Sequence, residues 1–371
     1  MRQYLAISAI SVLLILLACP SAYADTVYHV GFRTLGQWLP EGSLRLDVNI
    51  WYPSIRPPRD LNYSPWKFAA ALGGKPVEER FPLLLLSHDT AGNRFTYHDT
   101  ATMLASLGFV VAVPNHPRDN MDNMDDLFTW RQLDSRVREL VGTIDLLLAT
   151  PDMESCIDRT RMGVIGFGAG GTAALLLGGA LPNCDYWPAY CDNTNAFDMY
   201  CHIWARNRIN LLCKHLPLTK SLADSRVKAV AAISPAFGML FSHSSFRWFY
   251  PPLLLIAAGN DSMNPPSLHA RRFFELVNKK ARWLLLPQAD AGALMAPCPA
   301  SLADELPEMC RSVPPEIKAD VHKSMHKALQ DFFLHYLGSN TDVPSIPPPP
   351  DLSPPLPAPV QQPAVRQKKR R

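Results

Sequence analysis

A glycine-rich turn at residues 161–171 is the segment whose residue types and spacing most directly indicate chemistry. It reads Arg-Met-Gly-Val-Ile-Gly-Phe-Gly-Ala-Gly-Gly and joins an apolar, strand-like run to a run of small, apolar residues typical of a buried helix. Two chemistries use a strand, a tight glycine turn and a helix. One is phosphate binding at a helix start, and the other is a nucleophile elbow that lifts a serine above a sheet.

The spacing Gly166-x-Gly168-x-x-Gly171 matches the dinucleotide fingerprint, but the context of that fingerprint is missing. A strand ending in an acidic residue should follow about 20 residues later, and the chain instead reads Pro-Asn-Cys-Asp-Tyr-Trp-Pro at residues 182–188. The turn also comes after several strand-like runs, whereas the fingerprint usually opens its domain. We therefore expect no nucleotide, and we expect no other cofactor.

The same residues fit the nucleophile elbow better. The frame at residues 166–170 agrees with Gly-x-Ser-x-Gly at every position except the serine, because residue 168 is Gly168. An acidic residue follows later in the chain, in the order that such a fold requires. The sequence thus predicts the frame of an elbow without its oxygen nucleophile.

The elements that must position these residues alternate between strand-like and helix-like stretches. Strand-like runs lie at 44–52, 81–87, 109–114, 161–166, 227–234, 252–258 and 283–287, and helix-like runs at 97–106, 130–149, 169–179, 266–278 and 316–337. Inner runs such as 83–86 are continuously apolar, as in parallel strands with helices on both faces. The predicted fold class is α/β, with a mostly parallel central sheet covered by helices on both faces.

The N-terminal residues 1–24 have the form of an export signal. Arg2 provides the positive start, residues 5–17 are an apolar run, and Ala22 and Ala24 surround a small-residue cleavage point. A lipid on Cys19 is the alternative to cleavage after Ala24. Both versions predict an exported protein, periplasmic or secreted, in which disulfides are permitted.

Six of the eight cysteines gather in two segments. Residues 181–225 interrupt the alternation of strands and helices as an insertion or cap and hold Cys184, Cys191, Cys201 and Cys213, while the second group is Cys298 and Cys310. These spacings do not resemble zinc pairs, and export favours disulfides. We predict a bridge between Cys298 and Cys310 and two bridges among the other four, of open connectivity. Cys156 is expected to be a buried, inert thiol.

Charge and proline are concentrated at the C-terminal end. Residues 344–371 hold ten of the 35 prolines and end in Gln-Lys-Lys-Arg-Arg, so we expect a disordered tail whose basic end could touch an anionic surface. The domain at residues 25–343 is close to neutral although the whole chain carries +3. A near-neutral body gives no field that attracts nucleic acid, so we expect no nucleic-acid partner.

Several short sequence strings follow one another in a characteristic order between about residues 29 and 337. They are Val-Gly-Phe-Arg-Thr at 30–34, Trp-Tyr-Pro at 51–53, Phe-Pro-Leu at 81–83, Ser-His at 87–88, Leu-Gly-Phe-Val-Val-Ala-Val-Pro at 107–114, His-Pro-x-Asp-Asn at 116–120, Ile-Ser-Pro-Ala at 233–236 and Ala-Pro-Cys at 296–298. With them the chain resembles the exported dienelactone-hydrolase-like α/β-hydrolases and, more distantly, the plasma-type platelet-activating-factor acetylhydrolases. The resemblance implies an α/β-hydrolase fold and a Ser-Asp-His triad for hydrolysing esters or lactones.

Carried over residue by residue, the resemblance keeps the triad acid and loses its partners. Asp261 holds the acid position, Gly168 the serine position, and Ala291 the histidine position, which normally follows Leu-Pro-x-Ala-Gly. The oxyanion loop usually reads Ser-His-Gly and here reads Ser-His-Asp, so the resemblance places His88, Asp89 and Ala169 around the expected oxyanion. A carboxylate at Asp89 opposes the negative charge that such a hole stabilises.

These departures predict a catalytically inactive pseudoenzyme that binds an unidentified protein or small molecule in or near the former pocket. The alternative is an active ester or lactone hydrolase with a relocated nucleophile, and Ser87, His98, His116 and Ser234 are the polar candidates for it. Ser87 and His88 should not pair with each other, because neighbours on a strand point to opposite faces.

We expect no metal site. His322 and His326 share one face of a predicted helix, but the residues between them do not match a zinc-protease motif, so we interpret the pair as a surface feature. The acidic loop at residues 119–126 lacks the spacing of a calcium-binding loop and is expected to be solvated.

Overall fold

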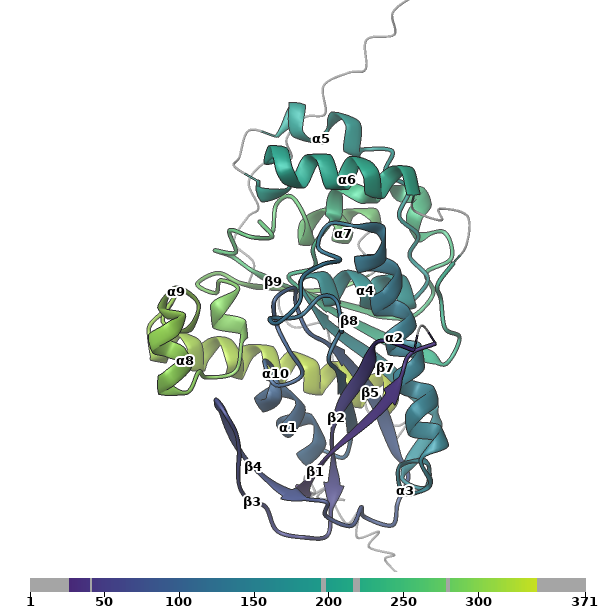
Figure 1. Cartoon of the computed structure of the whole chain (residues 1–371), viewed down its shortest axis with the longest axis vertical. Helices are drawn as coiled ribbons and strands as arrows, with labels where there is room; N and C mark the ends of the chain where they lie inside the picture. The colour runs from purple at the N-terminus through teal and green to yellow at the C-terminus, as the bar shows by residue number, and fades with distance from the viewer. Residues whose placement is uncertain (1–26, 41, 195–197, 216–220, 278–280, 339–371) are drawn as a thin grey trace, which may run out of the picture.

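The computed structural model describes residues 27–40, 42–194, 198–215, 221–277 and 281–338 (Figure 1). The predicted leader and the predicted proline-rich tail lie outside these ranges. Within them, no helix is both long enough and apolar enough to cross a membrane.

One sheet runs through the centre of the molecule, and its order among the described strands is β10-β9-β8-β7-β5-β6-β2-β1-β4-β3. The strands are β1 (His29–Trp38), β2 (Arg45–Ser54), β3 (Arg59–Tyr63), β4 (Trp66–Leu72), β5 (Phe81–Ser87), β6 (Val110–Pro114), β7 (Ile157–Phe167), β8 (Val227–Ile233), β9 (Leu253–Ala258) and β10 (Arg282–Leu286). The stretch from β10 to β6 is parallel, while β2 pairs antiparallel with both β6 and β1. The carboxyl ends of the parallel strands therefore meet at one edge, where ligands bind in open α/β sheets.

Helices cover both faces of this sheet (Figure 1). They are α1 (His98–Ser106), α2 (Trp130–Ala149), α3 (Pro151–Glu154), α4 (Ala169–Leu177), α5 (Trp187–Asn193), α6 (Ile203–His215), α7 (Ala270–Leu276), α8 (Ala300–Glu305), α9 (Pro307–Cys310) and α10 (Pro315–Leu337). Leu83 and Leu85 of β5 pack into the core shared with α2 and α4, whereas Leu84 and Leu86 pack into the core shared with α1 and α10. Both faces of β5 are buried, which explains its continuous apolar sequence.

The predicted α/β class, the mostly parallel sheet and the helical cover on both faces are confirmed. Three strands, β1, β3 and β4, are not predicted from the sequence. In β1 half-buried and exposed residues alternate after residue 32, and β3 is mostly exposed, so neither carries the continuous apolar pattern of the inner strands. The strand β4 follows the cis peptide bond before Pro65 and pairs with both β1 and β3.

All predicted disulfides are present. Cys298 bonds to Cys310 as predicted, and the insertion is held by Cys184–Cys213 and Cys191–Cys201, which resolves the connectivity that the sequence left open. The insertion carries α5 and α6 and lies above α7 and α4 at the top of Figure 1. The three bridges are consistent with an extracellular protein.

Cys156 is the free thiol among the described residues, and it is buried. Burial raises the pKa of Cys156 to about 11, so the reactive thiolate is scarce at neutral pH. The thiol donates to the carbonyl of Met153 at 3.3 Å. These contacts agree with the predicted inert thiol.

Candidate active site

The turn between β7 and α4 has the backbone of a nucleophile elbow. Gly168 lies at φ +52° and ψ −117°, a conformation that favours glycine, and its N–H donates to the carbonyl of Ile233 at 2.9 Å. Close packing dictates the flanking glycines. A Cβ at Gly166 would lie 2.0 Å from the carbonyl oxygen of Gly170, and one at Gly170 would lie 2.2 Å from that of Ser87. The sequence folds into an elbow even though the residue at its apex offers no nucleophile.

The carboxylate of Asp89 fills the space that a serine side chain would need at this apex. A Cβ atom at position 168 would lie 1.9 Å from Asp89 Oδ1 and 2.0 Å from Asp89 Cγ. Separations this short are impossible between non-bonded atoms. A serine at 168 and the Asp89 carboxylate therefore exclude each other in this arrangement.

The Asp89 carboxylate also binds the backbone N–H groups at this turn. Its Oδ1 accepts hydrogen bonds from the backbone N–H of Ala169 at 2.8 Å and of Thr90 at 2.7 Å. In an elbow fold, the N–H after the nucleophile and an N–H from a neighbouring loop bind the oxyanion of the tetrahedral intermediate. A resident carboxylate oxygen thus holds the position where that charge would develop.

The pKa of the Asp89 carboxyl lies near neutral pH. Burial raises the pKa of Asp89 to about 7, against the lowering effect of the bonds from Ala169 and Thr90 and of the Arg136 guanidinium. The charge of Asp261 raises the pKa further, which places the two carboxyl groups in electrostatic range of each other. Both the protonated and the ionised form of Asp89 are consequently populated near neutral pH.

Asp261, which the resemblance places at the position of a triad acid, has one carboxylate oxygen with hydrogen-bond donors and one without among the described residues. Asp261 follows β9, is 3% exposed, and its Oδ1 accepts from the N–H groups of Met263 and Asn264, both at 2.9 Å. Its Oδ2 is buried and has no hydrogen-bond partner among the described residues. Desolvation raises the pKa of Asp261, against the lowering effect of the Asn264 and Met263 N–H groups and of the Ser234 hydroxyl.

The position of the missing histidine lies on the loop after β10. The N–H of Asn260, the neighbour of Asp261, donates to the carbonyl of Ala289 at 2.8 Å, so this loop runs beside the loop of the acid. Ala291 stands at its turn and offers a methyl group in place of an imidazole. The structure thus brings Gly168, Asp89 and Asp261 to one edge of the sheet, with Ala291 on the adjoining loop.

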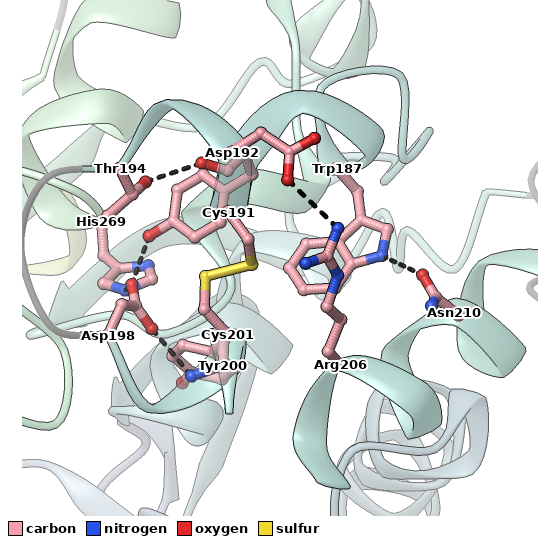
Figure 2. Close-up of a disulfide and its surroundings, with 11 residues drawn as sticks. Trp187, Cys191, Asp192, Thr194, Asp198, Tyr200, Cys201, Arg206, Asn210 and His269 are labelled. Carbon is pink, nitrogen blue, oxygen red and sulfur yellow. Dashed lines mark hydrogen bonds and ion pairs between the residues drawn. A yellow bond between two sulfur atoms is a disulfide. The ribbon is translucent and has the colours of Figure 1, made fainter. Parts of the chain in front are cut away.

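An imidazole, His269, does lie within electrostatic range of Asp261, but both of its nitrogens contact other groups. His269 is fully buried, and its Nδ1 accepts the N–H of Gly238 at 3.1 Å, so the proton sits on Nε2. Nε2 is 3.4 Å from Asp198 Oδ2, a carboxylate of the disulfide-bonded insertion (Figure 2). Asp198 also accepts the hydroxyl of Tyr190. His269 therefore binds the insertion to the body and does not complete a triad, and no motif in the sequence marked it.

Two tyrosines line the same region. Tyr97 precedes α1 and stacks on Phe167 of the elbow strand, with ring centroids 3.6 Å apart. Tyr200 comes from the insertion and donates its hydroxyl to Asn264 at 2.8 Å. Burial raises the pKa of both tyrosines, and the charges of Asp89 and Asp261 raise it further. Aromatic rings from the body and the insertion thus lie within electrostatic range of both carboxyl groups.

A second Ser-His-acid chain lies beneath the oxyanion loop. Ser87 Oγ is 2.8 Å from His116 Nε2, and His116 Nδ1 is 2.6 Å from Glu139 Oε2. Because a carboxylate accepts, Nδ1–H donates to Glu139 and Nε2 accepts the hydroxyl of Ser87. This is the bonding order of a catalytic triad. Ser87 and His116 are separate candidates in the sequence, and only the fold brings them together with Glu139.

Burial separates this chain from any substrate. Ser87 is 0% and His116 1% exposed, and burial holds the pKa of His116 well below its usual range, which opposes the imidazolium that a general base must form. Arg136 also donates to Ser87 Oγ at 3.3 Å and, from its Nε, to Asp119 at 2.6 Å. The chain is a buried hydrogen-bond network under the loop of Asp89. The expectation of a solvated loop at residues 119–126 is wrong for Asp119 and Asp126, which are both 3% exposed.

The remaining candidates have structural bonds. His88 Nδ1 lies 2.7 Å from the carbonyl of Asp89, and its Nε2 accepts the N–H of His116 at 3.3 Å. Ser234 Oγ accepts the N–H of Ala258 at 3.1 Å. His98 stacks on Phe68, with ring centroids 5.3 Å apart. As expected, Ser87 and His88 do not pair.

Comparisons with known proteins agree with this fold. Residues 68–190 match the model of the dienelactone hydrolase family, which confirms the resemblance over that range. Among solved structures, a ferulic acid esterase from Streptomyces cinnamoneus, determined at 2.4 Å, is similar with a TM-score of 0.55 and 18% identity; the match covers 88% of this chain and 96% of that chain. A search of curated proteins finds no match. The α/β-hydrolase fold is therefore established, and the match covers the elbow.

Proposed function

We propose that this α/β-hydrolase-fold protein is exported and does not hydrolyse esters, and that the region around Gly168, Asp89 and Asp261 binds a ligand instead. The observation that carries the proposal is the Asp89 carboxylate, which fills the space of a serine side chain and accepts the Ala169 N–H. Acyl transfer needs an oxygen nucleophile, a base and an empty oxyanion hole. This site lacks the first two and fills the third.

The chemistry of the site defines the ligand class. An ester carbonyl or a carboxylate would meet the Asp89 carboxylate where an esterase presents N–H donors, so such ligands are disfavoured. Asp261 Oδ2 instead offers a buried acceptor without a partner within the described part of the chain. Tyr97 and Tyr200 add aromatic faces nearby. Two carboxyl groups beside aromatic rings suit a ligand with an amine or other cationic donor.

Two assays on the purified protein test the loss of catalysis. A fluorophosphonate probe and short-chain p-nitrophenyl esters should give no labelling and no turnover. Restoring a serine and a histidine at the triad positions tests the cause of the inactivity. Gly168→Ser with Ala291→His should remain inactive because Asp89 still collides with the serine, whereas adding Asp89→Gly should restore labelling at residue 168. Labelling of the unaltered protein would contradict the proposal.

The alternative of a relocated nucleophile has one specific observation in its favour, the Ser87–His116–Glu139 chain. It predicts fluorophosphonate labelling that disappears in Ser87→Ala. We expect no such labelling, because Ser87 is fully buried and bonded on both sides.

The ligand class is tested by thermal shift. A series of alkylammonium ions should raise the melting temperature, while short carboxylates of equal chain length should not. Asp261→Asn keeps the shape of the side chain and removes its charge, so the alkylammonium effect should vanish in this variant. Equal shifts from both series would refute a cationic ligand.

A further inference from the structure

Three potential ligand groups converge between α1 and α10, away from the elbow. Asp99 lies on α1, and His322 and His326 lie four residues apart on α10, so α1 and α10 each contribute to one cluster (Figure 1). One ligand atom from each residue lies within 4.8 Å of the other two. The sequence showed the histidine pair but not the carboxylate, which comes from more than 220 residues earlier.

The distances fit a single ion after small movements. Asp99 Oδ2 is 2.6 Å from His322 Nδ1 and 3.7 Å from His326 Nε2. Ligand atoms around a tetrahedral zinc ion with bonds of about 2.0–2.1 Å lie roughly 3.3 Å apart. The observed values fall on either side of that separation. An ion would push His322 slightly away from the carboxylate and draw His326 slightly inward, where it would replace the contact of Nε2 with the Thr100 hydroxyl at 3.0 Å.

Both ring nitrogens of His322 face hydrogen-bond acceptors, although a neutral imidazole has one N–H to donate. Nδ1 faces the Asp99 carboxylate at 2.6 Å, and Nε2 faces the carbonyl of Ala293 at 3.0 Å. Both partners are acceptors, and a neutral imidazole has a single N–H. A single N–H therefore cannot serve both contacts, and a metal ion held by Nδ1 and the Asp99 carboxylate would leave Nε2–H for Ala293.

The surroundings resemble those of bound metals. A metal-ligating histidine usually donates its other N–H to a backbone carbonyl or carboxylate, which is the relation of His322 to Ala293. The second carboxylate oxygen, Asp99 Oδ1, is buried and has no hydrogen-bond partner among the residues that the structure describes. The three side chains are 11–21% exposed, so an ion and a water ligand can reach them.

We propose that Asp99, His322 and His326 bind one divalent transition-metal ion, with zinc as the expected ion and water completing its coordination. Imidazole and carboxylate together suit Zn²⁺ and related first-row ions, and three protein ligands with one open position are common for zinc. His322 is buried, which also corrects the expectation of a surface pair. Because His322 contacts the carbonyl of Ala293, the ion would connect the loop that carries Ala291 to both helices.

The test is metal binding by the purified full chain after dialysis against EDTA. Zn²⁺ titration by calorimetry should show one site per chain, and Co²⁺ should give the visible absorption of a low-coordinate histidine site. Asp99→Asn and His326→Gln should each weaken binding by more than the roughly 10–100-fold typical of second-shell changes. The control is His202→Gln with His243→Gln, two exposed histidines outside the cluster, which should bind like the unaltered chain.

Folding is checked independently by circular dichroism, and His326→Gln alters a side chain that is 20% exposed, so it keeps the test valid if Asp99→Asn misfolds. Zn²⁺ should also raise the melting temperature of the unaltered chain and of the control, and not that of the two cluster variants. Absence of Zn²⁺ binding, or binding that persists in both cluster variants, would overturn the proposal.

Discussion

The exclusion between Asp89 and a side chain at position 168 gives a quantitative prediction. Gly168→Ser adds two costs to the folded state. Holding a residue other than glycine at φ +52° and ψ −117° costs roughly 1–3 kcal/mol. Moving the Asp89 carboxylate off two N–H donors removes two hydrogen bonds, together about 3 kcal/mol at the low end of the range for charged groups. The free energy of unfolding should therefore fall by about 4–6 kcal/mol.

The same substitution should be far milder once the carboxylate is gone. In an Asp89→Gly background only the backbone cost remains, so Gly168→Ser should lower the free energy of unfolding by about 1–3 kcal/mol. The two changes are then coupled by about 3 kcal/mol, well above the few tenths expected of independent sites. Urea denaturation of the four proteins in the cycle measures this coupling energy.

Gly73 provides a control for a serine placed at positive φ. It lies at φ +60°, and a Cβ there would meet nothing within 4 Å. Gly73→Ser should lower the free energy of unfolding by the same amount whether residue 89 is aspartate or glycine. The reasoning fails if Gly168→Ser costs no more than Gly73→Ser, or if its cost is unchanged in the Asp89→Gly background.

Three further predictions follow from other contacts. Since burial raises the pKa of Asp89 from 3.8 to about 7, the native state prefers the protonated form, and the free energy of unfolding should fall as the pH rises from about 4 to 7. The urea midpoint of Asp89→Asn should not fall over this pH range. An equal fall in the variant would contradict the assignment. Replacing Cys298 and Cys310 by serine opens a 12-residue loop and should cost about 3 kcal/mol by loop entropy, measured as a lower melting temperature; no change would show that the bridge is energetically silent. Arg136→Met leaves the buried Asp119 carboxylate without its cation and should cost about 3–5 kcal/mol in urea denaturation, much of it recovered by adding Asp119→Leu; a double variant no more stable than Arg136→Met would disprove the pairing.

The parallel part of the fold could be predicted because burial leaves a clear mark on sequence. A strand covered on both faces must be apolar at every position, so β5 and α2 were predicted with the bounds that the structure shows, and the other inner elements within a few residues. The insertion was recognised as an interruption, but its helices α5 and α6 were not. They are held by disulfides and by contacts such as Trp187 Nε1 to Asn210 at 2.7 Å, which no periodic pattern announces.

The chemistry of the site was predictable only where one residue type is required at a fixed place in a motif. Gly168, Ala291 and Asp89 could be identified as departures because an elbow, a base and an oxyanion loop each need a specific residue. Side-chain partners could not be predicted. Glu139 and His269 carry no motif, and each meets its partner through the packing of elements distant in sequence.

On our proposal that Gly168 and Ala291 occupy the serine and histidine positions of a triad, its two halves are left in different states, and this difference indicates where a ligand should bind. On the nucleophile side, Gly168 and Asp89 are complementary, so they act as one change and not as two independent losses; the vacated volume and the N–H donors are both taken. On the base side nothing replaces the imidazole, and Asp261 Oδ2 keeps an unused acceptor within the described structure. An unpaired buried acceptor costs about 1–3 kcal/mol, which a ligand that donates to it would recover. Substitutions at Asp261 should consequently weaken ligand binding more than substitutions at Asp89, and calorimetric titration of both variants with the same alkylammonium ion compares them directly.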